Sequence, residues 1–135
     1  MKQWLKNRAT ERLANHVMAK YEMIKPVPKK GLFNHRCFSN AVEWALNHEG
    51  TKVIEVIYID TGTPILHYVN QNRRGEYLET TLGHMAPHFV YYRIREIHRD
   101  DWQYIDGEFQ RAQRAWTREW SNSFINALFG IESIL

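Results

Sequence analysis

The stretch that decides the fold is residues 52–81, which read KVIEVIYIDTGTPILHYVNQNRRGEYLETT. Residues 52–60 are rich in β-branched and aromatic side chains, as is typical of a mostly buried strand. The rest of the stretch divides into a turn at 61–64, a strand at 65–70, a polar loop at 71–75 and a strand at 76–81. We therefore expect three consecutive strands, of which the last two form a β-hairpin.

A helix is predicted before these strands and a further strand after them. From Cys37 to His48, apolar residues recur at the spacing of one buried helical stripe, and residues 88–97 show a strand pattern with one partly polar face. The expected fold class is α+β, with the Cys-bearing helix packed on a small antiparallel sheet of about four strands and with helices at both ends of the chain.

The chain is predicted to form a single domain over residues 1–135, the usual size for one core. Residues 1–30 are expected to be a basic helix, running to about residue 24, and a Pro-containing linker. Residues 31–99 hold the Cys helix and the sheet. A helical segment is expected at 100–135, where aromatic and small apolar residues recur at helical steps: Phe109, Ala112, Trp116 and Trp120.

Charge and cysteine content narrow the class of protein. Eight Lys or Arg and two Glu give residues 1–30 a charge of +6, whereas residues 31–135 carry −3. This asymmetry suits an acidic protein partner for the N-terminal helix, although a solvated helix face has the same composition. One Cys cannot form an internal disulfide, and no signal peptide or membrane span is recognisable, so we expect a cytoplasmic protein without a membrane partner.

The candidate catalytic residues are Cys37, His67 and Glu79. A thiol at a helix N-terminus lies at the positive end of the helix dipole, which favours the nucleophilic thiolate. If residues 71–75 are the hairpin loop, Asn70 pairs with Glu76 and His67 comes directly opposite Glu79. The carboxylate can then orient the imidazole, which acts as the base for the thiol.

This order resembles the papain-like cysteine peptidase and amidase superfamily, including its compact bacterial amidase and transglutaminase-like branches. The resemblance covers about residues 31–82 and rests on three short motifs. These are RCFSNA at 36–41, LHY at 66–68 and GEYLETT at 75–81. The same motifs are similar to a group of small uncharacterised phage-type proteins.

The resemblance implies a thiol hydrolase or acyltransferase that acts on an amide or acyl bond of a protein, peptide or similar substrate. Cys37 would be the nucleophile, His67 the general base and acid, and Glu79 the orienting group. The Cys37 backbone N–H would stabilise the oxyanion together with a second donor. No Gln precedes Cys37 at the place where papain has one. Asn34, His35 or Asn40 could substitute as the oxyanion donor, and of these Asn34 and Asn40 are the expected oxyanion or supporting residues.

Other functions are weaker expectations. His84 and His88 have the spacing of a helical metal pair, but Pro87 lies between them, so we expect neither a metal nor a cofactor. Arginines at the hairpin tip and on the last strand can contact phosphates, yet no nucleic-acid-binding module is recognisable. The main alternative to an enzyme is a non-catalytic binding module, such as a phage protein that engages a host protein through a terminal helix.

Overall fold

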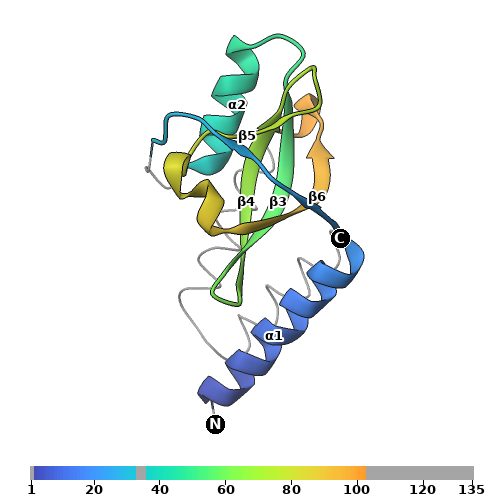
Figure 1. Cartoon of the computed structure of the whole chain (residues 1–135). Helices are drawn as coiled ribbons and strands as arrows, with labels where there is room; N and C mark the ends of the chain where they lie inside the picture. The colour runs from blue at the N-terminus through green and yellow to red at the C-terminus, as the bar shows by residue number, and fades with distance from the viewer. Residues whose placement is uncertain (1, 33–35, 103–135) are drawn as a thin grey trace.

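The computed structural model describes residues 2–32 and 36–102 of the chain (Figure 1). Its helices are α1 (Lys2–Lys20) and α2 (Cys37–Asn47), with short 3-10 turns η1 (Gly83–His88) and η2 (Arg99–Asp101). Its strands are β1 (Glu22–Ile24), β2 (Val27–Pro28), β3 (Lys52–Asp60), β4 (Thr63–Gln71), β5 (Tyr77–Glu79) and β6 (Val90–Ile97). The helix predicted around Trp116, like Asn34, lies outside the described residues.

The fold is α+β, as predicted, but the sheet is larger and mixed. Its strands lie in the order β1-β6-β3-β4-β5-β2, and they curl into a strongly bent sheet with α2 alongside β3 and β4 (Figure 1). The prediction of about four antiparallel strands omitted β1 and β2. Strand β1 pairs with β6 in the antiparallel sense, whereas β2 runs parallel to β5.

The two additional strands come from the segment expected to be helix end and linker. Helix α1 ends at Lys20, not near residue 24, and Met23 pairs with Tyr92 of β6. Pro28 pairs with Glu79 at the sheet edge, where a residue without an N–H can be accommodated. The segment expected to be helix end and linker thus forms both edge strands of the sheet.

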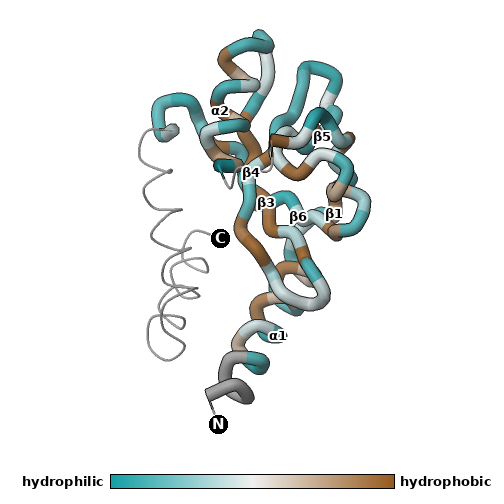
Figure 2. The backbone as a smooth tube through the Cα atoms, turned by 90° about the vertical axis from the view of Figure 1, so that its left-hand side faces the viewer, coloured by the Kyte–Doolittle hydropathy of each residue, from teal (hydrophilic) through white to brown (hydrophobic). Residues whose placement is uncertain are grey.

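Apolar side chains pack on both faces of the central strands, and a hydrophobic stretch along β3 is visible in Figure 2. The helix-side cluster comprises Leu13, Val17, Cys37, Phe38, Ala41, Val53, Ile57, Leu66, Tyr68 and Ile97. The opposite cluster comprises Ile24, Ile54, Val56, Val69, Ala86 and Tyr91. Burial of each large apolar side chain contributes about 1.5–3 kcal/mol to folding, which makes these clusters the main stabilising force.

The hairpin has a different register from the predicted one. Asn70 pairs with Leu78 and Gln71 with Tyr77, so the five-residue loop is 72–76 and not 71–75. Asn72 explains the shift, because its side-chain Oδ1 accepts hydrogen bonds from the backbone N–H groups of Arg74 and Glu76, at 3.0 Å each. The predicted pairing of Asn70 with Glu76, and with it His67 directly opposite Glu79, is therefore wrong.

A close approach of two backbones fixes the segment after β5. Gly83 has φ +51°, and a Cβ there would lie 2.7 Å from the backbone nitrogen of Gly31. Leu32 N–H donates to the carbonyl of Thr81 at 3.0 Å beside this contact. Glycine is required because any side chain would separate the two segments. The chain leading towards Cys37 is thereby held next to the end of β5.

Candidate active site

Cys37 is the first residue of α2. The first helical hydrogen bond runs from Asn40 N–H to the Arg36 carbonyl at 2.8 Å, and no side chain caps the helix start. The N–H groups of residues 37–39 therefore have no acceptor within the helix, and they give this end a partial positive charge. A thiolate at Cys37 lies where the helix stabilises negative charge.

His67 and Glu79 form a buried charged pair. The Nε2 atom of His67 lies 2.9 Å from Oε2 and 3.1 Å from Oε1 of Glu79. The two side chains are 5% and 0% exposed. An ionised carboxylate only accepts hydrogen bonds, so Nε2 is the donor and Nδ1 is the ring nitrogen left for the thiol.

Three further donors hold the Glu79 carboxylate. Oε1 accepts hydrogen bonds from the backbone N–H groups of Thr81 at 2.9 Å and Leu82 at 3.0 Å, and Oε2 accepts the Tyr91 hydroxyl at 2.7 Å. Burial by itself raises the pKa of Glu79, but the charge and hydrogen bond of His67, with the donors at Leu82 and Tyr91, outweigh it and lower the pKa. The carboxylate is therefore ionised and fixed in orientation.

The imidazole of His67 interacts with both Glu79 and Cys37. Burial lowers the pKa of His67, but the interactions with Cys37 and Glu79 outweigh burial and raise the pKa to about 10. His67 is therefore an imidazolium at neutral pH. The arrangement Cys37, His67, Glu79 thus couples a thiol to a cationic imidazole that a carboxylate orients.

Cys37 interacts with His67 although the two residues come from different faces of the sheet. His67 pairs with Val56 and shares its face, which carries the opposite cluster, whereas Cys37 belongs to the helix-side cluster. The β4–β5 ladder has only two pairs, at residues 70/78 and 71/77, and His67 lies beyond them.

Aromatic rings enclose the imidazole. Tyr58 contacts His67 edge to face with centroids 5.2 Å apart, and it also packs on Phe89 and Tyr91. Burial, followed by the charges of Cys37, Asp60 and Glu79, raises the pKa of Tyr58 to about 12. These rings exclude water from the ion pair and strengthen its electrostatics.

The supporting residue Asn40 connects the helix to the carboxylate segment. Its Nδ2 donates to Thr81 Oγ1 at 2.9 Å in a buried contact. Asn40 is thereby connected to Glu79 through one residue, because the backbone N–H of Thr81 donates to the Glu79 carboxylate. A second tie comes from Asn70, whose Nδ2 donates to the Ala41 carbonyl at 2.8 Å and whose Oδ1 accepts from Thr80 at 3.1 Å.

Sequence reasoning missed Tyr91, Asn70 and the two N–H donors of residues 81 and 82. A partial signal existed for the N–H donors, because a carboxylate followed by two threonines at a strand end often binds nearby backbone groups. No local pattern predicts that Tyr91, twelve residues beyond Glu79, reaches the same carboxylate. That contact depends on how β6 pairs across the sheet.

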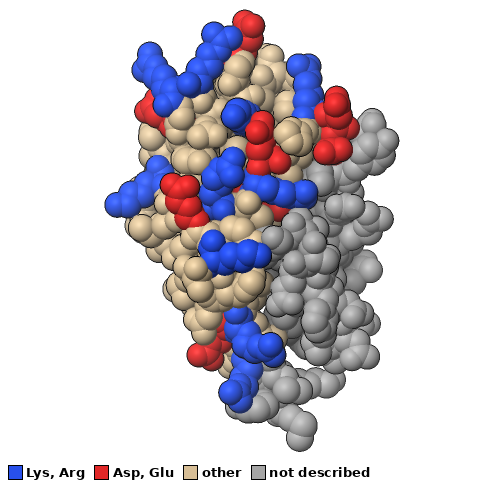
Figure 3. Space-filling view, turned by 90° about the vertical axis from the view of Figure 1, so that its right-hand side faces the viewer, with Lys and Arg blue, Asp and Glu red and all other residues tan. Residues whose placement is uncertain are grey.

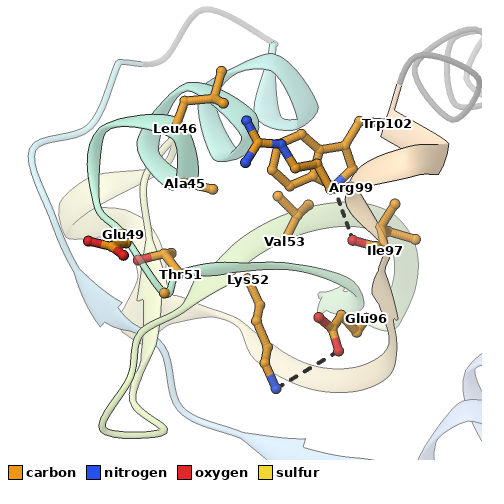
Figure 4. Close-up of a pocket in the computed structure, with 11 residues that line it drawn as sticks. Ala45, Leu46, Glu49, Thr51, Lys52, Val53, Glu96, Ile97, Arg99 and Trp102 are labelled. Atoms are coloured by element: carbon orange, nitrogen blue, oxygen red, sulfur yellow. Dashed lines mark hydrogen bonds and ion pairs between the residues drawn. The ribbon is translucent and has the colours of Figure 1, made fainter.

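The site itself is buried, with Cys37 5% and His67 4% exposed. Two pockets in the described part of the chain lie elsewhere along α2. One, of about 250 Å³, is at the C-terminal end of α2, where Trp102 and Arg99 lie above Val53 and a Lys52–Glu96 ion pair forms the rim (Figure 4). The other, of about 480 Å³, follows Phe38, Val42 and Leu46 along the helix to Trp102. None of the three candidate catalytic residues lines either pocket.

The surface charges on one face are mixed. On the face shown in Figure 3, Lys and Arg side chains lie among Asp and Glu side chains and do not form a stripe of one sign.

Within residues 2–32 and 36–102, no group of three His, Cys, Asp or Glu has the arrangement of a metal site. Of the helices in the described ranges, none is long and apolar enough to cross a membrane.

Comparison of the chain with protein-family models, with curated proteins and with solved structures finds no match. The functional assignment therefore depends on the geometry of the site.

Proposed function

We propose that this protein is a papain-like thiol hydrolase or acyltransferase in which Cys37, His67 and Glu79 act as nucleophile, acid–base and orienting group. The observation that carries the proposal is the position of His67, whose Nε2 binds the Glu79 carboxylate at 2.9 Å while Cys37 lies near enough to raise the pKa of the ring. The raised pKa of His67 supports a thiolate–imidazolium pair. A lone cysteine suits a reducing compartment, so we place the reaction in the cytoplasm.

In the proposed reaction the thiolate sulfur attacks the carbonyl carbon of an amide or related acyl group, and the carbonyl π electrons move to oxygen. His67 gives its proton to the leaving amine as the C–N bond breaks, which leaves a thioester on Cys37 and a neutral imidazole. The imidazole then takes a proton from water or an acceptor amine, whose attack releases the acyl product and restores the thiolate. No oxidant, metal or cofactor enters this balance.

The oxyanion would be stabilised at the N-terminus of α2. The backbone N–H groups at residues 37–39 are aligned there and have no helical acceptor, which is the arrangement that stabilises a developing negative charge. Asn40 supports this end through Thr81. Asn34 keeps its proposed role as a second donor, which its position three residues before Cys37 suggests.

The proposal is tested by the rate at which iodoacetamide alkylates Cys37. Because the chain has a single cysteine, mass spectrometry reports this residue alone. We expect alkylation at pH 6–7 to exceed that of a free thiol, since a free Cys with a pKa of about 8.5 holds only a few per cent thiolate there. His67→Ala should slow the reaction at least tenfold, by loss of the imidazolium that stabilises the thiolate.

A matched control is His48→Ala, because His48 hydrogen-bonds Trp44 at an exposed part of α2 away from the site. It should leave the rate unchanged. A slow wild-type rate that His67→Ala does not alter would contradict the catalytic assignment.

The near-complete burial of Cys37 and His67 favours a second candidate, a non-catalytic binding module that keeps the charged triad as a structural element. Such a protein, for example a phage protein, would bind an acidic host protein through the basic α1. Cys37→Ala would then leave binding intact, whereas Arg8→Ala and Arg12→Ala would weaken it in a salt-dependent manner.

A further inference from the structure

Glu79 has two oxygens whose hydrogen-bond partners differ in origin. Oε1 is held by the N–H groups of its own segment, at Thr81 and Leu82, and these would accompany Glu79 in any movement of that segment. Oε2 is held by the Tyr91 hydroxyl at 2.7 Å, and Tyr91 belongs to β6, three positions away in the sheet. Besides His67 of β4, Tyr91 is therefore a donor that fixes the carboxylate relative to the central sheet.

Tyr91 is itself immobilised. It is 1% exposed, belongs to the opposite cluster with Ile24 and Val56, and pairs with Tyr58 of β3. Ring contacts join it to Tyr58 at 5.7 Å and to His67 at 6.3 Å. Its hydroxyl thus has a defined position, and the hydroxyl lies on the same carboxylate oxygen that receives the shorter bond from His67.

We propose that Tyr91 is a positioning residue of the proposed thiol reaction, which holds Glu79 Oε2 in line with Nε2 of His67 and thereby sets the orientation of the imidazole towards Cys37. The inference rests on the proposed function for its catalytic consequence. The positioning itself depends on the hydrogen bonds that join Tyr91, Glu79 and His67, and its effect on the Glu79 carboxylate can be measured without turnover. A charge-assisted O–H to carboxylate bond of this length is among the stronger hydrogen bonds in proteins.

The chain offers a matched control in Tyr68. Like Tyr91, it is 1% exposed on a central strand, and its hydroxyl donates to a buried carboxylate, Glu55 Oε2, at 2.9 Å. The Glu55 carboxylate also accepts a hydrogen bond from Arg95 Nε at 3.2 Å, not from a histidine. Tyr68→Phe therefore removes the same kind of hydrogen bond as Tyr91→Phe but leaves the hydrogen bonds between His67, Glu79 and Tyr91 in place.

The experiment compares wild type, Tyr91→Phe and Tyr68→Phe by two measurements. The first is the alkylation rate of Cys37 at neutral pH. The second is the titration midpoint of Glu79 followed by carboxyl carbon NMR. The titratable groups that interact with this carboxylate are His67 from β4, Tyr91 from β6 and Tyr58 from β3, and the Cys37 thiol of α2 interacts with His67. Only the Tyr91 contact changes in the test variant.

Tyr91→Phe should raise the midpoint of Glu79, because one hydrogen bond to the ionised form is lost, and should slow alkylation about tenfold, as loss of an outer hydrogen bond does at other sites. Tyr68→Phe should leave the Glu79 midpoint at the wild-type value and should change the alkylation rate less than Tyr91→Phe does. Replacement of Tyr91 by 3-fluorotyrosine, which keeps the hydroxyl and makes it a stronger donor, should lower the midpoint even if the Phe variant folds poorly.

The inference is overturned if Tyr91→Phe leaves the Glu79 midpoint unchanged, or if Tyr68→Phe slows alkylation by the same factor. Failure of the proposed function gives a different pattern. The wild-type thiol would then react slowly and without dependence on His67, while the Glu79 midpoint would still respond to Tyr91.

Discussion

The Nε2 atom of His67 lies 2.9 Å from Oε2 of Glu79, although the two residues are not partners across the hairpin. The observed register pairs Asn70 with Leu78, so its continuation would place Val69, and not His67, opposite Glu79. Residues two apart on a strand share a face, and a diagonal neighbour lies within reach of long side chains. His67 and Glu79 are diagonal neighbours of this kind.

Glu79→Gln should lower the free energy of unfolding by about 3 kcal/mol, the order seen when one partner of a buried ion pair is removed. The amide would keep an oxygen for the N–H groups of Thr81 and Leu82, but it places an uncharged group next to His67. The pKa of His67 should fall as a result. Urea denaturation at pH 7 measures the first effect, and NMR titration of the His67 ring measures the second.

Glu76→Gln is the matched control, because Glu76 is exposed in the hairpin loop and its carboxylate accepts a hydrogen bond from the Asn72 side chain. Its effect on stability should stay within about 0.5 kcal/mol, as for most surface substitutions. Equal losses in the two variants would show that the His67–Glu79 pair does not stabilise the fold.

The sequence was sufficient to predict that His67 and Glu79 share a face, because the predicted and observed registers differ by an even number of residues. Moving the five-residue loop from 71–75 to 72–76 shifts the strand pairing by two residues, and a shift of two keeps every side chain on its face. What the pattern could not predict is that Asn72 starts the turn through its side chain, which makes Gln71 the last residue of β4.

Long-range contacts set the rest of the site, and these have no local signal. Helix α2 and strand β3 were predictable because apolar periodicity and β-branched residues specify them directly. Strand β2 has two residues and becomes a strand only by pairing with β5. The Tyr91 contact to Glu79 likewise requires β6 to lie beside β3, which no spacing in the sequence indicates.

Stability should fall as the pH rises from about 7 towards 10. The pKa of His67 is raised from 6.5 to about 10, so its contribution is complete below about pH 6.5 and is lost as the pH rises through about 10. Glu79 has a lowered pKa, and its contribution is present above 4.5 and is lost only at lower pH. Urea denaturation between about pH 6 and 9.5 measures the slope before unfolded tyrosines ionise near pH 10.

His67→Gln supplies the comparison for this slope. The variant should be less stable than wild type at pH 6 and should approach it at pH 9.5, because only the wild type loses a favourable protonated group in that range. Parallel pH profiles for the two proteins would mean that His67 has an ordinary pKa in the fold.

Asn70→Leu should destabilise the protein by about 3 kcal/mol. Asn70 is fully buried, and its side chain serves the carbonyls of Ala41 and Lys52 and the hydroxyl of Thr80. Leucine has a similar volume but leaves those groups without this partner, and each unsatisfied buried group costs about 1–3 kcal/mol. Thermal and urea denaturation report the loss.

Asn47→Ala is the control for Asn70→Leu. The Asn47 amide donates to the Glu43 carbonyl on the exposed face of α2, the helix that Asn70 binds at Ala41. We expect a change below about 0.5 kcal/mol. If Asn70→Leu is no more damaging than Asn47→Ala, the contact between α2 and β4 is held by apolar packing alone.

Thr81→Val should slow alkylation of Cys37 more than Thr80→Val does, although the two changes remove similar bonds. Both threonines are buried, and each hydroxyl contacts the side chain of one buried asparagine, Asn40 for Thr81 and Asn70 for Thr80. Both variants should lose about 1–2 kcal/mol of stability. The Thr81 hydroxyl links Asn40, one turn after Cys37, directly to the segment whose N–H groups hold Glu79, whereas Thr80 reaches the helix through Asn70, so loss of the Thr81 hydroxyl should loosen the helix start from the carboxylate more. Measured alkylation rates that fall in proportion to stability in both variants would show that this link does not position the thiol.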